Sequence, residues 1–226
     1  MPRAGLTRDS VVETAAIMAD EVGLGSLTLA AIAERLGVKQ PSLYKHIDSL
    51  AGLHRSVSLL AKRELGDAIS RAAVGRSGAD AIFAMSHAYR DWAILHPGRY
   101  DVTQNPPAPG DVEDEATMVA AIQVITDVLA SYQLEGDDSI DAIRAFRSIL
   151  HGFISLETSG GFALKVDINR SFDRMIHGFT VALTQWTEPI DHSLSSARTQ
   201  NAKTPPEAGV ISGVRPDGFE PRPSDP

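Results

Sequence analysis

The apolar positions of one stretch, residues 28–47, predict two short helices joined by a tight turn. Thr28 has the hydroxyl group of a helix N-cap, and Gly37 stands where a helix ends in a left-handed conformation. Pro41 suits the first turn of a second helix, because a missing N–H costs nothing there. The inner positions are apolar and have helical spacing: Leu29, Ile32, Ala33 and Leu36 in the first helix, Leu43 and Ile47 in the second. This pattern predicts a helix-turn-helix.

The outer face of the second predicted helix carries hydrogen-bonding side chains. The N-terminal residues of a recognition helix meet base edges in the major groove of DNA, where Gln pairs with adenine and Lys with guanine. Tyr, Lys and His side chains suit phosphate oxygens, which fix the position of a protein on DNA. A polar surface on an ordinary helical hairpin would explain any one of these residues, but the whole pattern favours DNA contact. The residues concerned are Thr28, Lys39, Gln40, Pro41, Ser42, Tyr44, Lys45 and His46.

Helical periodicity continues through most of the chain up to about residue 188, and it indicates an all-α fold of about nine helices. The segment 103–110 holds three prolines, so it is predicted to be a loop. Apolar residues surround the helix from Val119 onward, and we expect this helix at the centre of the core. Besides the helix-turn-helix, the expected helices start at Thr7 or Asp9, cover about 53–72, 79–95, 111–129 and 139–159, and end with one capped by Asn169.

The acidic run at residues 111–115 has two interpretations. Carboxylates at this density can hold a metal ion or take part in catalysis. They are also typical of the first turn of a helix, where the helix dipole stabilises negative charge. We favour the second interpretation, and the sequence predicts neither a metal site nor a cofactor.

The charge of the chain is distributed unevenly. The net charge is −8, but residues 1–63 carry eight Lys or Arg against six Asp or Glu, so the acidic excess lies in the remainder. A local basic excess suits contact with nucleic acid, and the acidic remainder would orient the protein on DNA. The chain has no cysteine, no apolar run near the roughly 20 residues of a membrane span, and no signal-peptide core in residues 1–6. We therefore expect a cytoplasmic protein without membrane contact.

The segment of about residues 7–60 resembles the DNA-binding domain of the TetR family of transcriptional regulators. The resemblance rests on Gly37 followed by Leu43-Tyr44-Lys45-His46-Ile47, in which Ile47 replaces the usual aromatic residue. The family often has a phosphate-contacting Lys at the start of the next helix, but residues 48–52 contain none. His54 and Arg55 are the substitutes that we expect for this contact. Further along, the stretch 150–162 resembles a C-terminal subgroup with a His-Gly signature, here His151-Gly152.

The resemblance implies a division of the chain into a helix-turn-helix domain at 7–53 and a helical regulatory and dimerisation domain at 54–188. Residues 189–226 hold seven of the thirteen prolines and little apolar periodicity, which predicts a disordered tail. In the family the long helix after the helix-turn-helix links the two domains, and the last two helices pair with those of a second subunit. The implied dimer interface is Phe146, Leu150, Phe153, Ile154, Phe172, Met175, Ile176 and Phe179.

The function implied is that of a homodimeric transcriptional regulator, most simply a repressor, which binds a palindromic double-stranded DNA operator and is released by a small-molecule effector of unknown identity. An activator of the same fold is the alternative. A pocket for the effector is expected among Met85, Tyr89, Trp92, Tyr100, Gln123, Phe146 and His151, although these residues could equally form the core.

Two other classes of function remain as rivals. An enzyme in the helical domain would draw on His87, His96, His151 and His177, but the chain has no HExxH, nucleophile-elbow or phosphate-loop motif. A DNA-binding protein without sequence preference would need many phosphate contacts, and the acidic total charge argues against that. We therefore predict no catalytic residues.

Overall fold

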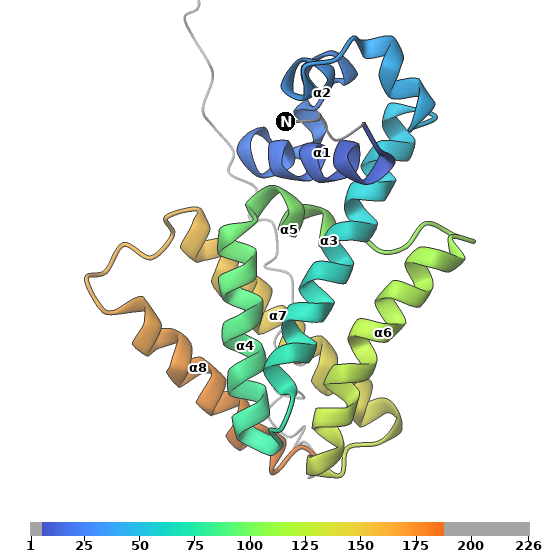
Figure 1. The fold of residues 1–226 in the computed structure, drawn as a ribbon. Coiled ribbons are helices and arrows are strands. Elements are labelled where there is room, and N and C mark those ends of the chain that lie inside the picture. The colour runs from blue at the N-terminus through green and yellow to red at the C-terminus, as the bar shows by residue number, and fades with distance from the viewer. Residues whose placement is uncertain (1–5, 188–226) are drawn as a thin grey trace, which may run out of the picture. The chain divides into compact units, whose positions relative to one another are not determined.

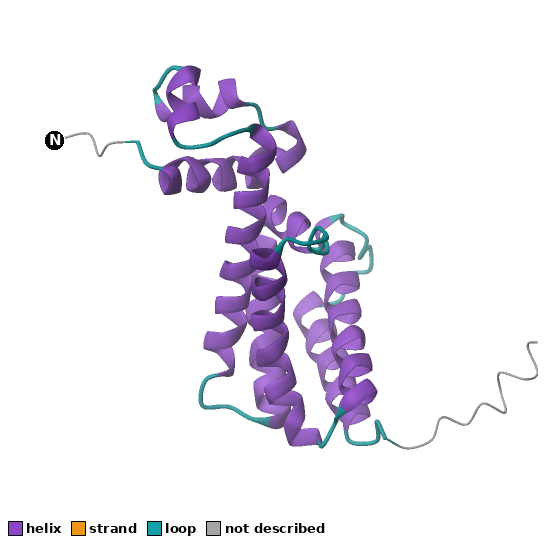
Figure 2. Ribbon diagram, turned by 90° about the vertical axis from the view of Figure 1, so that its right-hand side faces the viewer, coloured by secondary structure: helices purple, strands orange, loops and turns teal. Residues whose placement is uncertain are grey.

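A computed structural model describes residues 6–187 of the chain, and this part is entirely helical (Figures 1 and 2). Eight α-helices and the short 3-10 helix of the helix-turn-helix make up the nine expected helices, and the described residues contain no strand. The predicted tail lies outside the described residues. The α-helices are α1 (Arg8–Val22), α2 (Leu29–Leu36), α3 (Leu50–Ala73), α4 (Gly78–Leu95), α5 (Pro97–Thr103), α6 (Val112–Leu129), α7 (Gly136–Thr158) and α8 (Ile168–Leu183), and the 3-10 helices are η1 (Leu24–Ser26), η2 (Gln40–Lys45) and η3 (Ala130–Tyr132).

The N-terminal helices enclose a small hydrophobic core of their own. The Thr7 hydroxyl caps α1 by accepting the Ser10 amide, and the Thr28 hydroxyl caps α2 by accepting the Ala31 amide at 3.2 Å. Gly37 ends α2 at φ 66°, which is the left-handed turn that its position predicts. The core side chains are fully buried or nearly so, and they include Val11, Ala15, Ile32, Ala33, Leu43, Ile47, Leu53 and Val57.

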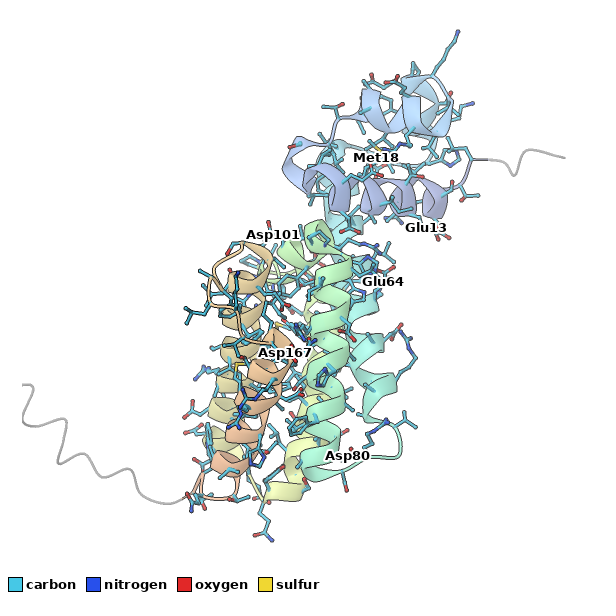
Figure 3. All side chains as sticks on the ribbon, turned by 90° about the vertical axis from the view of Figure 1, so that its left-hand side faces the viewer. Glu13, Met18, Glu64, Asp80, Asp101 and Asp167 are labelled. Atoms are coloured by element: carbon cyan, nitrogen blue, oxygen red, sulfur yellow. The ribbon has the colours of Figure 1, made fainter. Side chains whose placement is uncertain are left out.

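Helix α3 belongs to two cores. Its first turns contribute Leu53 and Val57 to the N-terminal core, whereas Leu65 and Ile69 pack in the larger core of the following helices. Figure 3 shows Glu64 at the point where α3 leaves the N-terminal helices. A single rigid helix therefore runs from one core into the other, and a displacement of α3 must reach both.

The larger core is built around α4, which packs against α3, α7 and α8. Aromatic side chains fill it, with Phe146 stacked on Phe179 at a centroid distance of 5.4 Å. The nearly buried Arg90 donates from Nε to Glu157 at 2.7 Å and from Nη1 to Asn169 at 2.9 Å, and it lies over the Phe172 ring. The partners of its charge and donors on α7 and α8 offset part of the cost of burying this cation.

The structure corrects three expectations about the local fold. Residues 97–103 form an additional helix, α5, where no helix was expected between about residues 95 and 111. The cap of α8 is Asp167, whose carboxylate accepts the Asn169 amide at 3.0 Å, and not Asn169 itself. Helix α6 is not central, because only Asp114, Val128 and Leu129 of this helix are buried. Of its apolar residues, Met118, Ile122 and Ile125 line a cavity, whereas Val112 and Val119 face solvent.

Within residues 6–187, no single helix is both long and apolar enough to cross a membrane. Only α6 and α7 taken together reach that length and hydropathy, and they are bent by 115° at the break between them.

Helix α5 touches α1 more closely than a side chain allows. A Cβ atom on Gly98 would lie 1.8 Å from the carbonyl oxygen of Ala19. The neighbouring Arg99 donates from Nε to Asp20 of α1 at 2.7 Å and from Nη1 to Glu64 of α3 at 2.6 Å. Three helices from both cores therefore meet at this point, and glycine is required there for steric reasons.

We predict that Gly98→Ala destabilises the protein by about 1–3 kcal/mol or more, because the clash is with backbone, which cannot move aside as a side chain can. Urea unfolding measures this change. Gly25→Ala is the matched control, since a Cβ there has no neighbour within 4 Å and the φ of Gly25 is not positive. Equal stability of the two variants would contradict the close packing of α5 on α1.

Candidate nucleic-acid interface and ligand cavity

The second helix of the helix-turn-helix, η2, is anchored by a buried side chain and has a polar outer face. Leu43 is fully buried against α2, and the following Ile47 is also buried. In a 3-10 helix, side chains three residues apart are aligned, so Pro41 lies in line with Tyr44 and Ser42 with Lys45. Tyr44 is 54% exposed, so its ring and hydroxyl are accessible from solvent.

The residues predicted to contact DNA differ in their exposure to solvent, and all except Thr28 lie within residues 39–46. Lys39, Gln40, Pro41, Tyr44 and Lys45 are exposed. Ser42 and His46 are half-buried, and the hydroxyl of the exposed Thr28 is already used to cap α2. The exposed group holds two Lys side chains and a Gln side chain, which are the types that contact phosphates and base edges.

Neither of the two residues expected to replace the family's phosphate contact is available in this structure. Arg55 donates from Nε and Nη2 to the Asp111 carboxylate at 2.5 and 2.6 Å, and from Nη2 to Glu113 at 3.0 Å. The Nε2 atom of His54 is buried without a hydrogen-bond partner among the described residues, and burial lowers the pKa of this ring. The cation of Arg55 serves a contact between helices instead.

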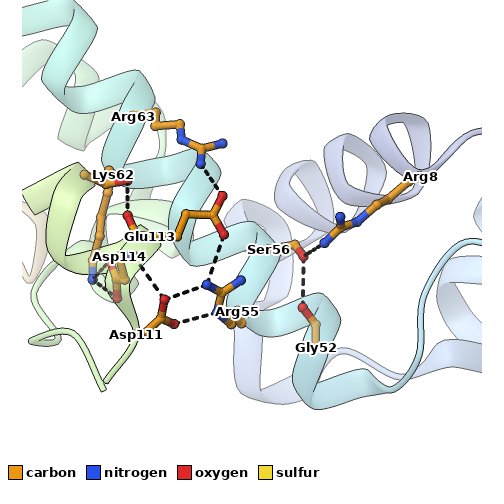
Figure 4. Close-up of polar contacts among 10 residues, drawn as sticks. Arg8, Gly52, Arg55, Ser56, Lys62, Arg63, Asp111, Glu113 and Asp114 are labelled. Carbon is orange, nitrogen blue, oxygen red and sulfur yellow. Dashed lines mark hydrogen bonds and ion pairs between the residues drawn. The ribbon is translucent and has the colours of Figure 1, made fainter. Parts of the chain in front are cut away.

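That contact is part of an ionic cluster between α3 and the start of α6, drawn in Figure 4. Besides Arg55, Lys62 donates to both oxygens of Asp114 at 2.7 and 2.8 Å, and Arg63 donates to Glu113 at 2.6 Å. Lys62 and Asp114 are both nearly buried, with side chains 9% and 11% exposed, whereas Arg63 and Glu113 are open to solvent. The buried pair therefore holds the two helices more strongly than the exposed pair does.

Asp111 has a second task in this cluster, because its carboxylate also caps α6. The Asp114 amide donates to Asp111 Oδ1 at 3.1 Å. The hydrogen bonds from Arg55 and from this amide lower the pKa of Asp111 from its ordinary 3.8 to about 2. The acidic run is thus an acidic first turn, as expected. The pairing with α3 across more than fifty residues of sequence is a contact that the local pattern did not predict.

A cavity of about 410 Å³ lies between α3, α6 and α7. Its walls are mainly apolar, and the polar groups that reach it include Tyr89, Gln104 and Arg147. The volume is in the range of small-molecule sites, and a few polar groups in an apolar wall are typical of such sites. The apolar wall is made largely by Leu65 and Ile69 of α3, Met118, Ile122 and Ile125 of α6, and Ile143, Phe146 and Leu150 of α7.

Two of the seven residues predicted for the pocket, Tyr89 and Phe146, line this cavity. Met85 and Trp92 belong to the packing of the core. Gln123 faces solvent and donates to Asp127 at 2.7 Å. Burial raises the pKa of Tyr100, which keeps its hydroxyl protonated, and the hydroxyl lies 2.9 Å from Nδ1 of the exposed His151. The sequence did not predict that apolar residues of α3 and α6 form walls of the cavity. The apolar residues on all sides of α6 were the one signal that this helix faces something other than solvent on more than one side.

Most of the side chains predicted for the dimer interface are buried within their own chain, and the interface itself stays a prediction. Their aromatic and aliphatic groups pack in the larger core around α4. The buried ones are Phe146, Leu150, Phe153, Ile154, Phe172, Ile176 and Phe179, while Met175 is half-buried. Most of the large apolar side chains of α7 and α8 close the core, whereas the exposed faces carry mainly polar and charged residues such as Arg147, His151 and Arg174.

The four histidines of the rival enzyme hypothesis do not converge on one site. His87 Nε2 lies 2.9 Å from Asp173 Oδ1 on the exposed side of α4 and α8. His96 is close to Asp20 and Arg99 near the end of α1, and His151 contacts Tyr100. His177 is exposed on α8. Each has a local structural contact or faces solvent, and no shared substrate position is formed.

Comparison with known proteins finds two matching families along the chain. Residues 11–57 match the family described as bacterial regulatory proteins, tetR family. Residues 82–179 match the tetracyclin repressor-like C-terminal domain. Neither match tests the His-Gly subgroup, which stays a prediction.

Individual relatives agree with these matches. An uncharacterized HTH-type transcriptional regulator of Mycobacterium tuberculosis, Rv0681, is 43% identical over 70% of this chain and 72% of its own length. The crystal structure of the regulatory protein SCO4313 has a TM-score of 0.63 at 26% identity, over 76% of this chain and 94% of that one. A TetR variant from Acinetobacter baumannii AYE in complex with minocycline has a TM-score of 0.61 at 19% identity, over 82% and 100% of the two chains, and it shows likeness of fold alone.

We predict that Arg55→Met raises the pKa of Asp111 from about 2 toward 3.8, because the Arg55 hydrogen bond is the largest cause of its depression. A depressed carboxyl pKa stabilises the folded state above pH 3.8, and this contribution is lost as the pH falls through about 2. Carboxyl-carbon NMR titration of the two proteins measures the shift. Arg71→Met, which alters an exposed cation elsewhere on α3, should leave the Asp111 pKa unchanged. An unchanged value in Arg55→Met would contradict the assigned contact.

Proposed function

The chain belongs to the TetR family of bacterial regulatory proteins, and on that premise we propose that it is a homodimeric, ligand-responsive repressor that binds a palindromic operator. Its helix-turn-helix domain occupies residues 7–53, and its regulatory and dimerisation domain occupies residues 54–188. The effector enters the cavity between α3, α6 and α7 and lowers the affinity for DNA. The site of action is the cytoplasm.

The observation that carries this proposal is the shared position of α3. Leu53 and Val57 of this helix belong to the same hydrophobic core as Leu43 of η2, and Leu65 and Ile69 line the cavity about three turns later. A ligand that favours a different position of α3 must therefore change the position of η2 on DNA. By linkage, DNA then lowers the affinity for the ligand by the same factor.

On the DNA side, we assign the exposed polar residues of η2 to two roles. Gln40 stands at the start of the helix, where residues meet base edges, and a bidentate contact there discriminates between bases. Tyr44 and Lys45 lie one turn later and contact phosphates, which position the protein without reading the sequence. One short helix reads few base pairs, so a dimer with recognition helices about 34–36 Å apart is needed for a specific operator.

On the dimer side, the support comes from two glycines in helix interiors. Gly152 of α7 and Gly178 of α8 each cost about 1 kcal/mol relative to alanine, yet a Cβ at either would meet nothing within 4 Å in this chain. Both face solvent, next to small residues such as Ser148 and Ala182. A second copy that packs α7 and α8 against these faces would use the space that glycine leaves.

For the effector, the minocycline bound by the Acinetobacter TetR variant is a precedent for a ligand in a protein of this fold. The cavity of the present chain is large enough for a small molecule and mainly apolar. Lys62 both lines the cavity and holds Asp114, so a bound molecule lies directly beside the α3–α6 cluster.

The test of DNA recognition starts from an operator selected out of a random-sequence pool. We predict that Tyr44→Ala and Lys45→Ala weaken binding to this operator and to random DNA by the same factor. Gln40→Ala should weaken binding to the operator but not to random DNA, by about 1–3 kcal/mol for the loss of one good base contact. Fluorescence anisotropy with both duplexes measures these changes. A uniform effect of Gln40→Ala would show that its role is not base recognition.

The test of dimerisation uses the exposed glycine of α7. We predict that Gly152→Leu converts the dimer to a monomer at micromolar concentration while leaving the melting of the chain's own helices intact, since the new side chain meets only solvent in a single chain. Sedimentation velocity gives the mass, and circular dichroism gives the helix content. Arg71→Leu provides a matched exposed substitution on α3. A dimer that survives Gly152→Leu would place the interface elsewhere.

A further inference from the structure

The charges around the cavity are all of one sign. Among its twenty lining residues, Lys62, Arg144 and Arg147 are cationic, and none is Asp or Glu. This is unexpected in a chain with a net charge of −8. A ligand that enters this cavity therefore meets positive charge with no lining carboxylate to balance it.

The three cations differ in what they already bind. Lys62 is held by both oxygens of Asp114 in a nearly buried pair, so its charge is neutralised. Arg144 has only a 3.3 Å contact with Asp141, and both side chains are strongly exposed, which makes the pair weak. Arg147 has no carboxylate partner among the described residues.

Arg147 is also held in place for a further contact. Its Nη2 atom donates to the Gln104 carbonyl oxygen at 3.0 Å and to Gln104 Oε1 at 3.3 Å. Its Nε and Nη1 atoms have no acceptor within the described part of the chain. A guanidinium group fixed on one side, with donors left over on the other, suits the planar, two-oxygen geometry of a carboxylate.

The remainder of the cavity is suited to hydrocarbon. Leu65, Ile69, Ile122 and Ile125 offer no hydrogen-bonding side chain, so a polar group there would lose its water without compensation. Arg144 and Arg147 line the cavity and are also exposed to solvent, so they lie at its entrance. The cavity thus has an apolar interior and a cationic entrance.

We propose that the effector class is an apolar monocarboxylate, with its carboxylate on Arg147, assisted by Arg144, and its hydrocarbon part between α3 and α6. This inference rests on the proposed function only where it gives the bound molecule a regulatory role, since the binding itself does not require DNA. Arg147 lies one helical turn from the cavity residues Ile143 and Leu150, so one rigid helix positions both the charge and part of the apolar wall.

The experiment is a calorimetric titration of the full chain, without DNA, with decanoate, 1-decanol and decylamine. The wild type should bind decanoate most tightly and decylamine least. Arg147→Gln should weaken the binding of decanoate about tenfold, as expected for the loss of one charged hydrogen-bonding contact, and should leave the affinity for 1-decanol unchanged. Arg71→Gln is the control that removes an equal charge away from the cavity. Octanoate and dodecanoate extend the series if decanoate does not match the length of the apolar interior.

The outcomes separate this inference from the proposed function. Equal binding of decanoate and 1-decanol across the three chain lengths, or equal loss in Arg147→Gln and Arg71→Gln, would overturn the carboxylate assignment while leaving an uncharged effector in place. Binding of decanoate that depends on Arg147 supports the assignment. If such binding leaves the operator affinity unaltered, the carboxylate site stands and the regulatory role of the cavity is refuted.

Discussion

The attachment of α6 to α3 is the contact on which the proposed regulation depends. Along most of its length α6 buries little, and only Val128 and Leu129 anchor the apolar side of its C-terminal end. At its other end the helix is held by Asp111 and Asp114 through their ion pairs with α3. The middle of α6 covers the cavity. The middle of α6 is half-buried along α3 and the cavity, so a change in the cavity's contents acts directly on the packing of α6 against α3.

The same ion pairs limit how the N-terminal domain meets DNA. Arg55, Lys62 and Arg63 make up three of the eight cations in residues 1–63, and all three are paired with carboxylates of α6. The charge left for DNA is therefore concentrated on the recognition helix and its surroundings, where Lys39 and Lys45 are exposed. In the proposed complex, specificity would therefore depend on the placement of these charges more than on their total, and α6 reduces the free positive charge of α3 by pairing with it.

The local signals in the sequence predicted what local physics decides. Thr28, Gly37 and Leu43 have the roles that capping, left-handed turns and apolar spacing assign to them. The position of α6 was predicted wrongly, because periodicity shows that a helix has apolar faces but not whether a neighbour or a cavity lies against them. For a related reason, periodicity does not separate core positions from interface positions: Phe172 and Ile176, predicted for the interface, close the chain's own core. The contacts of Arg55 and of Gly98 with distant helices leave no local pattern in the sequence.

The most direct test of the coupling between cavity and DNA is the operator affinity of Ala121→Trp. Ala121 lines the cavity on α6, and a Cβ on Gly66 of α3 would meet it at 3.5 Å, so a large side chain there must fill the space and separate the two helices. The account predicts a loss of operator affinity of about 5- to 150-fold, the range of typical couplings, with an unchanged dimer and helix content. Unaltered operator binding in a variant whose crystal structure shows the Trp side chain inside the cavity would contradict it.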